Sequence, residues 1–207
     1  MYISQELLIP GAVGNLEIII TRPKTDTLPT CYAVICHPHP LYGGTMNNKV
    51  VYMITSTFNQ LGIATLRFNF RGVGKSAGKF DQGDGETEDL RTIVDWLQKE
   101  YAPDKLWLAG FSFGSYVALR GHRDVKAKRL LLVAPPVERF KEAQLQLSDI
   151  PTLVIQGSKD EVVSSQAVSE WVTAQIHQPQ FIMMPDASHF FHGKLHELRE
   201  AILTVWN

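Results

Sequence analysis

Short apolar runs alternate with longer amphipathic segments along this chain. Runs rich in Val, Ile and Leu, several without polar alternation, are typical of strands buried on both faces of a sheet. Such runs predict strands over residues 16–22, 32–37, 63–70, 105–111, 129–136, 151–157 and 180–186. Apolar side chains near helical spacing predict helices over residues 47–61, 86–101, 164–176 and 190–206.

This order of elements predicts the fold class. Strands that alternate with helices form a parallel sheet with helices on both faces, so we expect an α/β fold with a doubly wound, mostly parallel sheet. No repeat, low-complexity tract or long linker interrupts the pattern, and 207 residues fit a single domain over residues 1–207. Ligands of such sheets bind beyond the carboxyl ends of the strands, which makes the residues directly after each strand the candidates for function.

Composition and charge narrow the classes of function. The net charge is −1 and the Lys and Arg residues are dispersed, so nothing favours a nucleic-acid or membrane partner. No stretch approaches the ~20 apolar residues of a membrane span, and the start "MYISQELLIPG" lacks the pattern of a secretion signal. Cys36, inside "YAVICH", is interpreted as a buried reduced thiol. We therefore expect a cytoplasmic protein, and we predict no cofactor.

The pattern Gly-x-Ser-x-Gly occurs twice, as "GFSFG" around Ser112 and as "GKSAG" around Ser76. A nucleophilic serine in this pattern stands at a tight turn between a strand and a helix, and the flanking glycines keep side chains out of that turn. A predicted strand leads into Ser112, and "FGSYVALRGH", which is compatible with a helix, follows it. Ser76 is followed by the glycine-rich "AGKFDQGDGE". Ser112 is the better candidate.

The segment "GVGKSAG" also imitates nucleotide-binding loops. A P-loop needs a leading glycine where this chain has Asn69, and it must open a helix. A dinucleotide-binding interpretation of residues 72–77 fails for the same lack of a helix. We interpret the segment as a structural loop that leaves the strand at 63–70.

A serine nucleophile needs a histidine base and a carboxylate that orients it, in the chain order serine, acid, histidine for this kind of turn. Asp160 lies just past the strand at 151–157, and His189 lies just past the last strand. We therefore predict Ser112, Asp160 and His189 as the catalytic residues. Asp160 alone also suits a turn.

Other acidic residues compete for the orienting role. Glu161 is the nearest substitute, and Asp149 or Glu138 would serve if the acid followed an earlier strand. Asp186 is close to the histidine in sequence, but we interpret it as a cap of the final helix.

Two groups of histidines raise the possibility of zinc binding. His189, His192 and His196 are spaced by three and four residues, and His37 and His39 form a His-x-His pair. No carboxylate falls at a characteristic offset, and the serine mechanism already uses His189. We predict no metal site, and we expect His192 and His196 on the surface of the last helix.

An acyl-transfer reaction also needs N–H donors for the oxyanion. The residue after the nucleophile, Phe113, supplies one, and the loop "HPHPLYGG" is expected to supply the second. Its prolines have no N–H, which leaves His39 or Leu41, with His39 favoured. Tyr42 is predicted to line the acyl pocket.

The segments "HPHPLYGGTMNNKVV", "TLRFNFRGVGKSAGKFDQGDGE", "GFSFGSYVAL", "GSKDEVV" and "ASHFF" together resemble small bacterial α/β-hydrolases related to dienelactone hydrolase. The resemblance covers essentially the whole chain. It implies the α/β-hydrolase fold, a Ser112–Asp160–His189 triad and esterase-like activity on small acyl substrates. Only a short stretch separates "LLVAPP" from "DIPTLVI", so we predict no sizeable lid domain, an open site and a preference for short-chain esters.

Two classes of function remain. The first is a serine hydrolase that cleaves small carboxylic esters or thioesters through an acyl-enzyme, with an acyltransferase or a peptidase as variants of the same triad. The second is a non-catalytic binding module that retains the fold. The sequence leaves the oligomeric state open.

Overall fold

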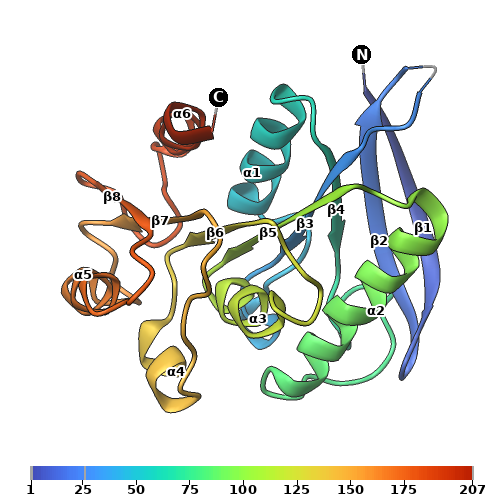
Figure 1. Cartoon of the computed structure of the whole chain (residues 1–207). Helices are drawn as coiled ribbons and strands as arrows, with labels where there is room; N and C mark the ends of the chain where they lie inside the picture. The colour runs from blue at the N-terminus through green and yellow to red at the C-terminus, as the bar shows by residue number, and fades with distance from the viewer. Residues whose placement is uncertain (1, 26, 207) are drawn as a thin grey trace.

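The computed structural model describes residues 2–25 and 27–206, and within them eight strands form one sheet (Figure 1). The strands are β1 (Tyr2–Gly11), β2 (Gly14–Pro23), β3 (Cys31–Cys36), β4 (Ala64–Phe68), β5 (Lys105–Phe111), β6 (Arg129–Val133), β7 (Thr152–Gly157) and β8 (Gln180–Met184). Their order is β1-β2-β4-β3-β5-β6-β7-β8. The β1–β2 and β2–β4 pairs are antiparallel and the remaining pairs are parallel.

Helices cover both faces of this sheet (Figure 1). One face carries α1 (Lys49–Gln60) and α6 (Leu195–Trp206), and the other carries α2 (Asp84–Tyr101), α3 (Phe113–Gly121), α4 (Val137–Glu142) and α5 (Ser165–Thr173). Successive strand residues point to opposite faces. Val34 accordingly packs into the core beneath α2 to α5, whereas Ile35 packs into the core beneath α1 and α6. Two covered faces explain why the strands read as continuous apolar runs.

The α/β fold with a mostly parallel sheet is confirmed, and all seven predicted strands are present. Sequence analysis did not predict β1. This edge strand has β2 as its one partner, and Ile9 is its one buried residue, so most of its side chains are exposed, unlike those of the strands that the apolar runs predicted. Between β6 and β7 the chain forms only α4, which leaves no sizeable lid.

Two expectations about the C-terminal segment are wrong. The last helix begins at Leu195, so His192 lies in an exposed turn before it, whereas His196 is on the helix surface as expected. Asp186 does not cap that helix. It has a positive φ of 56° in the turn after β8, and its carboxylate pairs with Lys159.

The described helices contain no segment with the length and apolar character that crossing a membrane requires.

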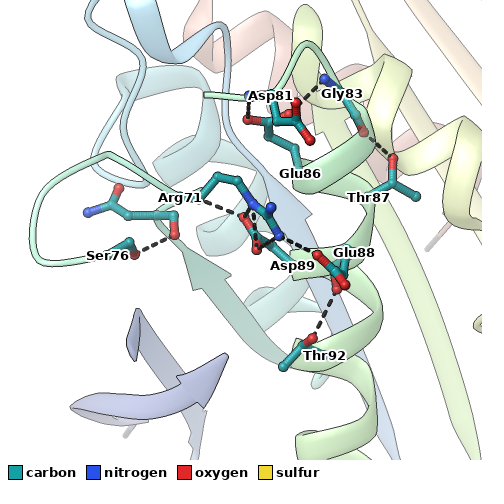
Figure 2. A network of polar contacts seen from close by, with 10 residues as sticks. Arg71, Ser76, Asp81, Gly83, Glu86, Thr87, Glu88, Asp89 and Thr92 are labelled. Carbon is teal, nitrogen blue, oxygen red and sulfur yellow. Dashed lines mark hydrogen bonds and ion pairs between the residues drawn. The ribbon is translucent and has the colours of Figure 1, made fainter. Parts of the chain in front are cut away.

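The segment that follows β4 is fixed to α2 by a buried ion pair (Figure 2). The Arg71 guanidinium donates to both carboxylate oxygens of Asp89 at 2.7–3.1 Å and to Glu88 at 2.8 Å. Burial raises the pKa of the Asp89 carboxyl, although its hydrogen bonds from Arg71 act in the opposite direction. At the start of α2, the Glu86 carboxylate accepts from the N–H of Gly83 at 2.7 Å.

The second Gly-x-Ser-x-Gly motif lies in this same segment. Ser76 is buried and donates to the Asn69 carbonyl at 2.6 Å (Figure 2). It also accepts from the Glu17 N–H at 2.9 Å. No helix follows it directly, because α2 begins at Asp84. The motif is therefore a structural loop, as the sequence indicated.

Candidate active site

Ser112 occupies a strained corner between β5 and α3. Its φ and ψ of 53° and −121° fall in a region that residues with a side chain rarely adopt. The Ser112 N–H donates to the Val133 carbonyl on β6 at 2.8 Å. The buried Ser115 hydroxyl donates to the Gly110 carbonyl at 2.7 Å, which closes the turn from the other side. These bonds hold the serine at the carboxyl end of the sheet.

The two glycines of "GFSFG" are required by close packing at this corner. A Cβ atom on Gly110 would overlap the Gly114 carbonyl, and one on Gly114 would overlap the Cys36 carbonyl at the end of β3. Only hydrogen atoms fit at these positions between α3 and the strands β3 and β5. The two glycines therefore permit the tight strand-to-helix turn that the serine needs.

The structure brings Ser112, His189 and Asp160 into one chain of hydrogen bonds. The distance from Ser112 Oγ to His189 Nε2 is 3.0 Å, and the distance from His189 Nδ1 to Asp160 Oδ2 is 2.8 Å. Asp160 follows β7 and His189 follows β8, so both reach the same edge of the sheet as the serine. The Asp160 side chain is fully buried and the His189 side chain is 3% exposed, while Ser112 is part-exposed.

Asp160 sits in a cage of donors that keeps it ionised. Its Oδ1 accepts from the N–H groups of Val162 and Val163 at 2.8 and 2.7 Å, and its Oδ2 accepts from the Gln156 amide at 2.9 Å. Burial alone raises the pKa of this carboxyl, but the bonds from His189 and the backbone outweigh it and hold the pKa below its ordinary value. An ionised Asp160 only accepts, so the neutral imidazole carries its proton on Nδ1 and presents the Nε2 lone pair to Ser112.

The other acidic candidates do not contact the imidazole. The Glu161 carboxylate accepts from the backbone N–H of His189 at 3.1 Å. Asp149 lies 3.8 Å from His177, and Glu138 pairs with Lys141 at 3.2 Å.

Sequence reasoning missed Gln156 as a support of this site. It is fully buried, and the signal was present in "TLVIQG", where a lone glutamine interrupts an apolar strand.

The loop after β3 approaches Ser112 from the opposite side. The Leu41 N–H donates to His39 Nδ1 at 3.2 Å, and the N–H groups of Tyr42 and Gly44 both donate to the His39 carbonyl at 3.1 Å. Within the described part of the chain, the N–H groups of His39 and Phe113 have no hydrogen-bond partner. Of the two loop residues that the sequence left open, only His39 thus keeps a free donor.

His37 anchors this loop from within the core. Its Nδ1 lies 2.6 Å from the Pro38 carbonyl oxygen, and its Nε2 accepts from the Phe70 N–H at 3.0 Å. Burial lowers the pKa of His37 to about 4. Over residues 2–25 and 27–206, no three His, Cys, Asp or Glu side chains gather in a way that would hold a metal ion.

A cavity of about 530 Å³ opens beside Ser112. Its size is that of a site for a small molecule. The residues that line it are Pro38, His39, Tyr42, Gly43, Gly44, Asn48, Ser112, Phe113, Pro136, Arg139, Val162, Val163, His189 and Phe190. Tyr42 is 86% exposed at its rim and Val162 is 64% exposed, so the mouth of the cavity is uncovered.

Comparisons with known proteins agree with this fold. The model of the alpha/beta hydrolase domain family matches residues 34–200. A solved structure from Xanthomonas campestris, XC6422, an α/β serine hydrolase without a lid, is 45% identical and covers 96% of this chain and 91% of its own, with a TM-score of 0.90. The structure of an α/β serine hydrolase homologue from Coxiella burnetii is 46% identical, with a TM-score of 0.93. The match covers 98% of this chain and 97% of that chain.

A curated relative from Rickettsia prowazekii, RP471, is 36% identical over 208 residues, which are 95% of this chain and 86% of that protein. The family model and these relatives each cover most of the chain. The protein therefore belongs to the α/β hydrolase family and is a hydrolase of its serine type.

Proposed function

We propose that this protein hydrolyses small carboxylic esters or thioesters through an acyl-enzyme, with Ser112 as nucleophile, His189 as base and Asp160 as the orienting acid. The observation that carries the proposal is the continuous hydrogen-bond chain from Asp160 through His189 to Ser112, with links of 2.8 and 3.0 Å. It ends at a part-exposed hydroxyl that lines a cavity of about 530 Å³.

In the first half of the proposed reaction, His189 Nε2 takes the proton of the Ser112 hydroxyl as Oγ attacks the substrate carbonyl carbon. Asp160 holds the imidazole in position and stabilises the imidazolium that forms. The bond from the carbonyl carbon to the leaving oxygen or sulfur then breaks. His189 returns its proton to the leaving alcohol or thiol, and the acyl group stays on Oγ.

The carbonyl oxygen gains negative charge during this attack, and it needs donors that are already in place. We assign this role to the N–H groups of Phe113 and His39, because both are free within the described part of the chain and both residues line the cavity. The side-chain ring of His39 packs on that of Phe113 with centroids 5.0 Å apart, which keeps the two residues adjacent.

In the second half, His189 takes a proton from water as the water oxygen attacks the acyl carbon. The bond from the acyl carbon to Ser112 Oγ then breaks, His189 returns its proton to Oγ, and the acid is released. The uncovered mouth favours this hydrolysis over acyl transfer, because an acyltransferase must keep water from the acyl-enzyme. The limited volume favours short acyl chains.

Labelling with a fluorophosphonate probe tests the nucleophile. The wild-type protein should be labelled, Ser112→Ala should not, and the matched variant Ser76→Ala should keep the label. Folded wild-type protein that takes up no label would favour a non-catalytic binding module.

A series of p-nitrophenyl esters of increasing acyl length tests the substrate class. We expect the highest kcat/KM at short chains. Activity that rises steadily toward long chains would contradict the proposed preference.

A further inference from the structure

Arg139 is the cationic side chain of the cavity wall. It projects from α4, the short helix between β6 and β7, and it lines the cavity together with Ser112 and His189. Its guanidinium carbon lies 5.3 Å from the centroid of the Phe113 ring and 4.9 Å from that of the Tyr116 ring. These contacts place the cation next to the residue whose N–H we assign to the oxyanion.

Arg139 has no acidic partner among the residues that the structure describes. Over the described residues, no carboxylate oxygen lies within 4 Å of its nitrogens. Among the acids of this region, Glu138 pairs with Lys141 and Asp84 pairs with Arg120, and Glu142, on the same helix, forms no ion pair with Arg139. Of its five N–H groups, the described contacts use a single donor bond, from Nη2 to the Gln82 carbonyl at 2.8 Å. Arg71, by contrast, is held by two carboxylates.

The charge of the cavity wall therefore has one sign. None of the described residues that line the cavity is acidic. The Asp160 side chain is fully buried behind His189, and Glu161 is bonded to the backbone N–H of His189. Burial, and then the Arg139 cation, lower the pKa of His39, which keeps that ring neutral near pH 7 beside the arginine. A cation with free donors in a largely apolar, acid-free cavity is a site for an anionic group.

We propose that Arg139 binds a carboxylate of the substrate, so that the preferred substrates are esters that carry a free carboxylate, such as monoesters of small dicarboxylic acids. This inference rests on the proposed function and deepens it. One planar guanidinium matches the two oxygens of a carboxylate, whereas a phosphate monoester dianion calls for more positive charge than this wall supplies. Arg139 is thereby a specificity-determining residue.

The test compares two substrates of nearly equal shape, p-nitrophenyl hemiglutarate and its uncharged carboxamide analogue. The wild type should prefer the hemiester by about tenfold or more in kcat/KM, as a charge-assisted hydrogen bond would give. The ratio of the two kcat/KM values should fall toward one in Arg139→Gln and persist in part in Arg139→Lys. It should also decrease with added salt, because the pair of Arg139 and the substrate carboxylate is part-exposed. The uncharged analogue, measured in each variant, corrects for any change in folding.

Arg120→Gln is the matched control. Arg120 also approaches the Tyr116 ring, at 6.0 Å, but it pairs with Asp84 and does not line the cavity. Its variant should keep the wild-type ratio. A ratio that is the same in the wild type and Arg139→Gln, with both esters hydrolysed, would overturn the role of Arg139 and leave the proposed function standing. A stronger preference for a matched phosphonate ester would overturn the choice of carboxylate.

Calorimetry on the Ser112→Ala protein separates this inference from catalysis. The ester p-nitrophenyl hemiglutarate should bind the Ser112→Ala protein. Its affinity should fall by about tenfold or more when Arg139→Gln is added. If the wild type hydrolysed neither ester, the proposed function would fail, and this measurement would still decide the binding role. Equal binding to the single and double variants would refute it.

Discussion

The backbone strain at Ser112 makes a prediction that separates stability from catalysis. Ser112→Gly and Ser112→Ala both remove the hydroxyl and its bond to His189. They differ only by the Cβ atom at a residue with φ of 53° and ψ of −121°. We expect the glycine variant to be the more stable of the two, although neither should be labelled by a fluorophosphonate.

The magnitude follows from two opposing terms. A residue with a side chain held in such a sparsely populated region costs about 1–3 kcal/mol, which glycine removes. Glycine in turn costs about 0.5–1 kcal/mol through the greater freedom of the unfolded chain. At the midpoints of these two ranges, the glycine variant should be more stable than the alanine variant by about 1 kcal/mol. For a chain of this size, that corresponds to a rise in Tm of about 2–4 °C.

Urea unfolding followed by circular dichroism measures the difference, and a control position reverses its sign. Ser169 lies inside α5, where glycine is disfavoured. There Ser169→Gly should be less stable than Ser169→Ala by roughly 1 kcal/mol. If Ser112→Gly were no more stable than Ser112→Ala while the Ser169 pair behaved as expected, the strain at the nucleophile would be refuted.

Three further predictions concern the carboxylate, the oxyanion donor and the buried histidine. Asp160→Asn should lower kcat/KM by about 10³–10⁴, because an amide at that position no longer fixes the tautomer of His189. A steady-state assay that found less than a tenfold loss would contradict the orienting role. His39→Pro retains the φ of −54° but removes the N–H, so it should lower kcat by a further ~10²–10³ relative to His39→Ala, which keeps that donor. Equal losses in the two variants would place the donor elsewhere. Because the folded pKa of His37 is about 4 against an ordinary 6.5, the unfolded chain binds the proton first as the pH falls. Stability from this group is thus complete above about pH 6.5 and is lost toward pH 4, with about 2 kcal/mol gone between pH 7 and pH 5. Urea titrations at pH 7 and pH 5 should show a smaller loss of unfolding free energy for His37→Asn than for the wild type. An equal loss would show that another group is responsible.

Much of the fold could be predicted because burial on both faces forces strands to be apolar throughout. The parallel strands β3 to β8 were all found in this way. β1 was not predicted because most of its side chains are exposed, so its residues are not apolar throughout. The start of α6 was misplaced because "ASHFFHG" forms a turn held by tertiary contacts, with Phe191 buried at a positive φ of 52°.

The order of elements and the residue types of the site could be predicted from the sequence, because each depends on residues close together in the chain. No distance is needed to recognise an apolar strand or a serine flanked by glycines. The same holds for an acid and a histidine that each follow a strand. Which of these groups contact one another was established by the folded structure. It separated Asp160 from Glu161, gave His39 rather than Leu41 the free N–H, and placed an unpaired Arg139 in the cavity. Sequence patterns do not give these contacts, because hydrogen bonds and ion pairs depend on atomic positions that are fixed by packing between segments distant in the chain.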